Sequence, residues 1–261
     1  MSAGFVRSLA VALGFAGAAA LSATAGLEAW AKAETAEIVA AKKDSSKQLK
    51  ELGLKTGLPV FIRIFKEDSL LEFWMQKDGK WTKYRDFEIC KWSGELGPKL
   101  REGDGQSPEG FYRVSKGSLN PNSSYYLSFN LGFPNRFDYE NERTGTYLMV
   151  HGNCVSVGCY AMTDPGIAVI YKLVEQALRN GQRAVPVHIF PFKMTDENLE
   201  KHKDSKWISF WRDIRPAYDI FNETGLLPQI KVLRKRYRVI ARSPARKKAV
   251  RRQSKWQTTD R

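Results

Sequence analysis

The feature that most constrains the fold is a row of short apolar segments in residues 58–92. Residues 58–66 and 69–76 are rich in β-branched and aromatic side chains, and residues 81–92 alternate apolar with polar side chains. Short polar turns separate the three segments. Runs of this length between turns are typical of strands, so we predict an antiparallel meander, which excludes an all-helical fold.

Further strand and helix patterns follow along the chain. Residues 93–110 are rich in glycine and contain two prolines, which predicts a long surface loop. Apolar periodicity predicts strands at residues 111–114, 125–130, 146–151 and 184–190, and helices at residues 37–52, 164–181 and 206–222. The first of these helices reads as a solvated lead-in, and the aromatic side chains of the last indicate core packing. These patterns predict an α+β, β-rich domain.

The N-terminal residues have the features of an export signal. Arg7 precedes a short apolar run at residues 9–21, and small-x-small sites end at Ala25 and Ala31. We predict a secretory signal over residues 1–31, cleaved after Ala31 or, as the second choice, after Ala25. An uncleaved anchor or a buried helix is the alternative. Export predicts a periplasmic protein in an oxidising compartment.

The net charge of +14 is concentrated at the C-terminus. Residues 231–261 contain 13 of the 42 Lys and Arg residues against one acid, Asp260. We predict an edge strand at residues 237–241 and a largely disordered basic tail over residues 233–261. After export, its anionic partners are lipid head groups or peptidoglycan carboxylates and not nucleic acid. A solvated tail without a specific partner is an equally open interpretation.

Residues 151–164 gather the residues that can do chemistry. His151 ends a predicted strand, on the side shared by Tyr147 and Met149, and Cys159 follows a tight turn at residues 156–158. A cysteine nucleophile needs a base and amide donors, which His151 and the turn can supply. The backbone or side chain of Gly152 or Asn153 can orient the imidazole. A metal site formed by His151, Cys154 and Cys159 is an alternative, although it has no convincing fourth ligand.

The chain has three cysteines, Cys90, Cys154 and Cys159. An odd number in an oxidising compartment indicates one pair and one free thiol. We favour a pairing of Cys90 with Cys154, which leaves Cys159 free. A disulfide between Cys154 and Cys159 is the alternative.

Residues 58–232 resemble the L,D-transpeptidase catalytic domain of the YkuD type, and in particular its YafK-like branch. The resemblance is carried by His151-Gly152, by the Ser-x-Gly-Cys turn at residues 156–159, and by Ser-Pro-Glu-Gly-Phe-Tyr at residues 107–112. It implies a mixed β-sandwich with peripheral helices, a nucleophile at Cys159, a proton acceptor at His151, and motif glycines at Gly152 and Gly158. It implies no cofactor and no metal. We expect the substrate to lie beside four residues of the same stretch, Tyr147, Met149, Asn153 and Ser156.

The resemblance also implies a reaction. Many members have Ser-His-Gly-Cys, whereas this chain has Val157 at the second His, which favours His151 as the sole base. The implied chemistry is acyl transfer on peptidoglycan stem peptides through a thioester at diaminopimelate. An amine acceptor makes the enzyme a transpeptidase, and water makes it an amidase that detaches an outer-membrane lipoprotein or protein. A noncatalytic wall-binding protein is the other class. The expected organisation is signal 1–31, lead-in helix and linker 32–57, catalytic domain 58–232 and tail 233–261.

Overall fold

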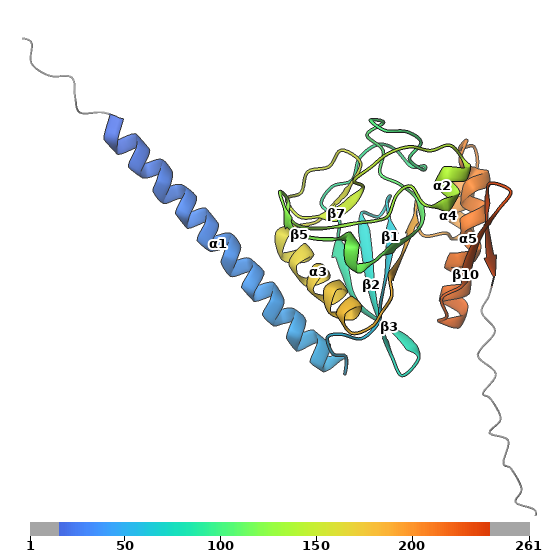
Figure 1. The fold of residues 1–261 in the computed structure, drawn as a ribbon, viewed down its shortest axis with the longest axis horizontal. Helices are drawn as coiled ribbons and strands as arrows, with labels where there is room; N and C mark the ends of the chain where they lie inside the picture. Colours follow the sequence, from blue (N-terminus) through green and yellow to red (C-terminus); the bar gives the residue numbers. More distant parts are fainter. Residues whose placement is uncertain (1–15, 241–261) are drawn as a thin grey trace, which may run out of the picture.

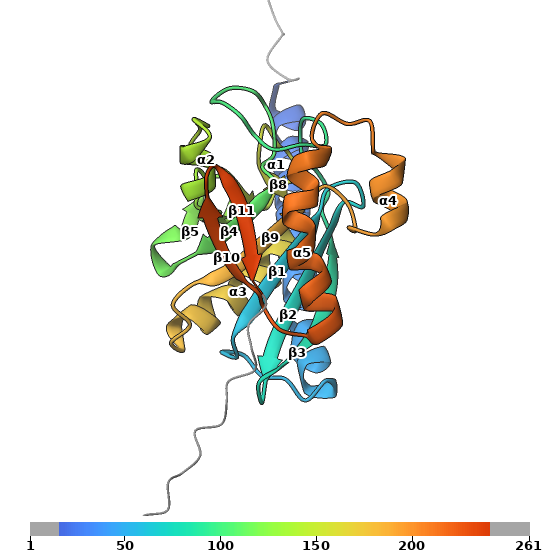
Figure 2. The ribbon, with the colours of Figure 1, turned by 90° about the vertical axis from the view of Figure 1, so that its right-hand side faces the viewer.

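The computed structural model describes residues 16–240, with side chains from residue 32 onward. Its largest sheet has five strands in the order β3-β2-β1-β9-β4 (Figures 1 and 2). The predicted meander is confirmed, because β1 pairs antiparallel with β2 and β2 with β3. β9 lies parallel to β1 and antiparallel to β4. These strands are β1 (Val60–Phe65), β2 (Leu70–Lys77), β3 (Lys80–Glu88), β4 (Gly110–Val114) and β9 (Val185–Phe190).

A second sheet carries the residues that can do chemistry. Its order is β5-β6-β7-β8, with β7 parallel to β8. The strands are β5 (Leu119–Ser123), β6 (Tyr126–Asn130), β7 (Met149–His151) and β8 (Tyr160–Ala161), and a short 3-10 helix, η1 (Lys116–Ser118), precedes β5. Apolar side chains of both sheets, such as Ile62, Val187 and Val150, share one buried core. The expected α+β fold, a mixed β-sandwich with peripheral helices, is confirmed.

Helix α3 (Asp164–Arg179) closes this core as its sequence predicts. Thr163 accepts a hydrogen bond from the Gly166 amide, and Pro165 lies in the first turn, where its missing N–H costs nothing. The predicted apolar stripe is buried: Ile167, Ile170, Val174, Ala177 and Leu178. The cap therefore fixes the start of α3 at Asp164, the last residue of the segment 151–164.

The outer face of the large sheet has a second, aromatic core. Helix α5 (Ile208–Thr224) and a hairpin of β10 (Gln229–Leu233) and β11 (Arg236–Ile240) lie side by side in front of the sheet (Figure 2). Trp211 and Phe221 of α5 are buried, so the predicted packing role of its aromatic residues is confirmed. Two short helices that the sequence did not predict, α2 (Arg136–Glu140) and α4 (Asp196–Lys201), border this layer.

Helix α1 (Ala16–Glu51) is longer and more closely packed than the predicted lead-in helix. It lies along α3 near the sandwich, and its N-terminal part extends away from it (Figure 1). The Tyr84 hydroxyl bonds Ser45 Oγ at 2.8 Å, and Leu49 is 5% exposed. The prediction of a solvated helix was wrong, because one apolar side docks on the domain. The helix also begins inside the predicted signal, and no helix among residues 16–240 has the length and apolar character needed to cross a membrane.

Three boundaries differ from the predicted ones. β3 ends at Glu88, because Lys91 turns away to form an isolated bridge with Ala161. β7 begins only at Met149, because Tyr147 has a positive φ of 54° that interrupts the strand. The expected edge strand at residues 237–241 exists as β11, so the folded chain continues beyond the predicted domain end at Val232. The tail beyond Ile240 lies outside the described residues.

Candidate active site

Cys159 lies directly before β8, in the connection that links β7 to β8, the two parallel strands of the second sheet. Its Sγ accepts a hydrogen bond from the Met149 amide at 3.4 Å and lies 3.6 Å from the Tyr147 carbonyl oxygen, which accepts from the thiol. Burial raises the pKa of the Cys159 thiol, and the Met149 amide and Lys99 offset this only in part. At neutral pH the resting group is therefore a thiol and needs a base.

Hydroxyl groups fix the nucleophile turn, which we define as residues 156–160. Ser107 Oγ and Ser156 Oγ both donate to the Cys159 carbonyl, at 2.9 and 2.7 Å. Gly158 has a φ of 108° and donates its N–H to Ser93 Oγ at 2.5 Å. The Ser156 hydroxyl, expected beside the substrate, thus supports the turn, and the Gly158 amide is already occupied by a protein acceptor.

The long loop of residues 93–109 supports the nucleophile turn through Ser93 and Ser107 and is itself fixed by a buried ion pair. Lys66 is fully buried, and its ammonium donates to the carbonyls of Glu95, Gly97 and Ser107 at 2.7 to 3.0 Å. It also pairs with the buried Glu109 carboxylate at 3.2 Å, which accepts a hydrogen bond from Trp211. Burial lowers the pKa of Lys66, while Glu109 raises it. A satisfied ion pair therefore fixes the Ser-Pro-Glu-Gly motif to the core.

His151, at the end of β7, is 2% exposed. Its Nδ1 lies 2.6 Å from the Gly152 carbonyl oxygen. A carbonyl only accepts, so Nδ1 carries the proton and Nε2 is left with its lone pair, free to act as a base. Burial lowers the pKa of His151, and the Gly152 carbonyl and Asp164 partly raise it, so the ring is neutral at pH 7.

Strand β7 holds the base at its end and contacts the thiol through the Met149 amide. In the parallel pair, Val150 lies opposite Tyr160 and His151 opposite Ala161. Cys159 directly precedes Tyr160 of β8, and its Sγ accepts from the amide of Met149, two residues before His151 in β7. The base and the thiol are both neutral in the resting state. Proton transfer from thiol to imidazole can then accompany attack.

The other expected substrate neighbours lie at the rim. Tyr147 is 78% exposed and borders a cavity of about 690 Å³ that Tyr139, Arg143 and Asn130 also line. Met149 contributes its amide to the thiol, as described above. Asn153 is exposed, and its N–H donates to Asp164 Oδ1 at 2.7 Å. Tyr147, Met149 and Ser156 thus contact Cys159, through a carbonyl, an amide and a hydroxyl, whereas Asn153 contacts Asp164 instead.

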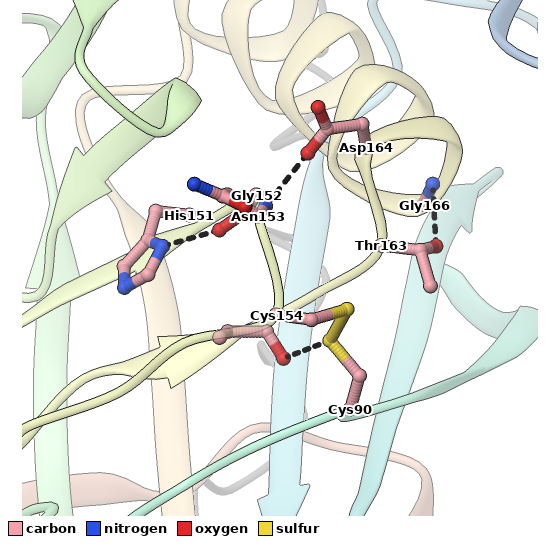
Figure 3. Close-up of a disulfide and its surroundings, with 9 residues drawn as sticks. Cys90, His151, Gly152, Asn153, Cys154, Thr163, Asp164 and Gly166 are labelled. Carbon is pink, nitrogen blue, oxygen red and sulfur yellow. Dashed lines mark hydrogen bonds between the residues drawn. A yellow bond between two sulfur atoms is a disulfide. The ribbon is translucent and has the colours of Figure 1, made fainter. Parts of the chain in front are cut away.

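The predicted disulfide between Cys90 and Cys154 is confirmed, with a Cα–Cα distance of 5.4 Å, and Cys159 is free. Figure 3 shows this disulfide beside the segment that follows His151. The Cys90 sulfur also lies 3.3 Å from the Ala161 carbonyl oxygen of β8. Because Cys154 is bonded to Cys90, the alternative metal site loses one of its three ligands.

A search of curated proteins finds a close relative in Escherichia coli (strain K12). "Putative L,D-transpeptidase YafK" is 47% identical over 181 residues, which cover 69% of this chain and 74% of the relative. The chain belongs to the YafK family. The protein of the same name from Escherichia coli O157:H7 matches with the same identity and coverage. No family model matches the chain.

Solved structures resemble this member of the YafK family only distantly. The helical cell shape determining protein Pgp2 from Campylobacter jejuni is 19% identical, with a TM-score of 0.42, over 72% of this chain and 79% of Pgp2. Bdellovibrio bacteriovorus Bd1075 is 23% identical, with a TM-score of 0.35, over 62% of this chain and 60% of Bd1075. With TM-scores below 0.5, neither structure adds to the family assignment.

Several site residues of this YafK-family chain carry no local sequence signal. Ser93 and Asp164 reach the site from a loop and a helix start that the sequence describes only as structural elements. The Tyr125 ring lies 4.7 Å from that of His151. Ser128 lies opposite His151 in the β6–β7 pair, and its buried hydroxyl has no hydrogen-bond partner among the described residues. In the sequence, Ser107 stands out only as part of the Ser-Pro-Glu-Gly motif.

Proposed function

We propose that this protein is an exported acyltransferase that acts on peptidoglycan stem peptides through a Cys159 thioester. The observation that carries the proposal is a free thiol held by the Met149 amide of β7, with an oriented imidazole at the end of the same strand. The family assignment supports the substrate class, because the relative's name refers to an L,D-transpeptidase. The neutral thiol and imidazole fit a nucleophile that is deprotonated during attack.

The proposed reaction has two half-reactions. In the first, His151 Nε2 takes the proton of Cys159, and Sγ attacks the carbonyl carbon of the diaminopimelate residue at stem position three. The bond from this carbon to the D-alanine nitrogen breaks, and D-alanine leaves with the proton returned from His151. The stem is then a thioester on Cys159. In the second, an acceptor attacks that carbonyl, His151 takes its proton, and the thiol is regenerated.

The acceptor decides between the two catalytic alternatives. A diaminopimelate amine gives a cross-link, and water gives hydrolysis, including release of a protein joined to the wall. Cys159 is only half-buried and the exposed side chain of Val157 occupies the place of a second histidine, so water has a path to the thioester. Hydrolysis therefore remains the second candidate for the same acyl-enzyme. The periplasm is the proposed compartment, and contact of the basic tail with anionic wall or membrane groups is proposed with it.

The test is incubation of purified protein with muropeptides that carry tetrapeptide stems, followed by mass spectrometry. Transfer predicts loss of D-alanine with accumulation of 3-3 cross-links. Hydrolysis predicts tripeptide stems, or release of lipoprotein from sacculi that bear it. Cys159→Ala is the matched control, because it removes only the sulfur. Products formed equally by this variant would show that Cys159 is not the nucleophile, and products formed by neither protein would leave the noncatalytic wall-binding alternative.

A further inference from the structure

The base segment, which we define as residues 151–154, is fixed at two points beyond His151. The Asn153 amide donates to Asp164 Oδ1 at 2.7 Å, at the first residue of α3. The next residue, Cys154, is joined to Cys90, 64 positions earlier in the chain. Figure 3 shows both attachments, with Asp164 above the base segment and Cys90 below it. One attachment is a charged hydrogen bond and the other is covalent.

The backbone of the base segment needs these attachments. Asn153 and Cys154 have φ values of 62° and 34°, in the left-handed region. Such a conformation is strained for a non-glycine residue and persists only where the surroundings enforce it. Two consecutive residues in this conformation will relax toward ordinary φ values once the enforcing contacts are removed.

Relaxation of the base segment would act on the base through Gly152. The Gly152 carbonyl accepts the proton of His151 Nδ1, which selects the tautomer with a free Nε2. Gly152 also packs directly on Asp164, since a Cβ at this position would lie 2.2 Å from Oδ1. A rotation of the peptide between Gly152 and Asn153 therefore moves this carbonyl away from the imidazole and breaks the bond to Asp164 together.

We propose that Asp164 and the Cys90–Cys154 disulfide are positioning groups for His151, and that reduction of this disulfide lowers the reactivity of Cys159. The proposal rests on the proposed function in taking His151 as the base. Cys154 is exposed and Cys90 half-buried, so a small dithiol can reach the bond. Its thiolate attacks Cys154 Sγ, the S–S bond breaks, and Cys90 leaves as thiolate and takes up a proton. The second thiol of the reagent then releases Cys154 as a thiol and closes the reagent's own disulfide.

The charges around the base segment define what each variant changes. Asp164 faces Glu34 of α1, and the hydrogen bond between the two carboxyls raises the pKa of Glu34. Asp164 also faces Tyr126 of β6, whose pKa is raised by burial and then by Asp164 and Glu34. His151 faces Asp164 and the Tyr125 ring. Asp164→Asn keeps an acceptor for the Asn153 amide and removes the charge. Asp164→Ala removes both.

The experiment measures the rate of alkylation of Cys159 by iodoacetamide, from pH 5 to 9, by mass spectrometry of the labelled peptide. His151→Ala sets the rate without the base. We expect Asp164→Ala, and the double variant Cys90→Ser with Cys154→Ser, to react about tenfold more slowly than the wild type, the size typical of a lost orienting contact. We expect Asp164→Asn to react within about twofold of wild type, with its pH midpoint shifted down because a charge that favours imidazolium is gone.

The double variant is needed because Cys90→Ser alone would free Cys154 to pair with Cys159. Circular dichroism checks that each variant is folded. Treatment of wild type with a dithiol, followed by reoxidation, supplies a second test without mutation, in which the Cys159 rate should fall and then recover. If Asp164→Ala, the double variant and the reduced protein all react at the wild-type rate while His151→Ala reacts slowly, the positioning proposal is overturned. The proposed function is then left standing. A His151→Ala as fast as wild type would instead show that His151 is not the base, and the proposed function would fail with it.

Discussion

The two halves of the candidate site are supported by different chemistry. The nucleophile turn is fixed by hydroxyl groups, Ser107 and Ser156 on the Cys159 carbonyl, above a fully buried pair of Lys66 with Glu109. The base segment is fixed near the surface by a disulfide and by the Asp164 carboxylate. Buried hydrogen bonds and a paired buried charge do not respond to mild oxidants, reductants or small pH changes. We therefore expect reduction to disturb the support of the base while the support of the nucleophile turn stays in place.

The largest effect is expected from removal of the buried cation below the nucleophile turn. Lys66→Ala leaves Glu109 buried without its partner and should lower the free energy of unfolding by about 3–5 kcal/mol, measured by urea denaturation. Lys203→Ala, which breaks only an exposed pair with Glu200, should change it by less than about 0.5 kcal/mol. Equal effects of the two variants would contradict the role assigned to Lys66.

Removal of the disulfide should come next. The double variant Cys90→Ser with Cys154→Ser opens a loop of 64 residues and should cost about 2–4 kcal/mol in the same urea experiment. Cys159→Ala is the matched control for loss of a sulfur without loss of a cross-link. A double variant as stable as the control would show that the segment is anchored without the disulfide.

Substitution of the two motif glycines, Gly152 and Gly158, tests the base segment and the nucleophile turn separately. Gly152→Ala places a Cβ 2.2 Å from Asp164 Oδ1, and Gly158→Ala places one at a φ of 108° and 3.1 Å from Leu148. Each should cost about 1–3 kcal/mol, through steric displacement in the base segment and through backbone strain in the turn. Gly79→Ala, at a φ of 79° in open space, isolates the strain. A Gly152→Ala protein no less stable than wild type would refute the close packing of the base segment on Asp164.

The smallest effect is expected from pH. Burial lowers the pKa of His151 and raises that of Cys159, so the alkylation rate should rise with pH as His151 loses its proton, at a pH below 6.5. A high rate that stays flat down to pH 4 would indicate a preformed thiolate and contradict the neutral pair.

The same experiment needs a stability control at acid pH. The folded-state pKa of His151 is lowered, so its contribution to stability is complete above 6.5 and is lost as pH falls. The pKa of His188 is lowered to about 3 by burial, so this residue also contributes stability that is lost as pH falls from 6.5 to about 3. Circular dichroism at each pH separates unfolding from loss of the base.

Sequence patterns predicted the elements that depend on interactions between residues close together in the chain. The meander and the Thr163-capped helix follow from periodicity and capping, and the odd number of cysteines predicted one free thiol. The docking of α1 was missed because its few apolar side chains are spread along a charged helix, and only the structure supplies their partners. The domain end was placed too early, at Val232, because Tyr237 is buried by packing on Phe137, far away in sequence. Ser93, Asp164 and Lys66 act through contacts across long stretches of chain, which periodicity does not encode.

The account's central claim is a covalent intermediate on Cys159, and its most direct test is intact-protein mass spectrometry. Wild-type protein would be mixed with tetrapeptide-stem muropeptide, quenched in acid within seconds, and compared with Cys159→Ala. We predict an adduct equal to the muropeptide minus D-alanine on the wild type, mapped to Cys159 and cleaved by hydroxylamine. An unmodified wild-type protein that nevertheless releases D-alanine, or an equal adduct on Cys159→Ala, would contradict the claim.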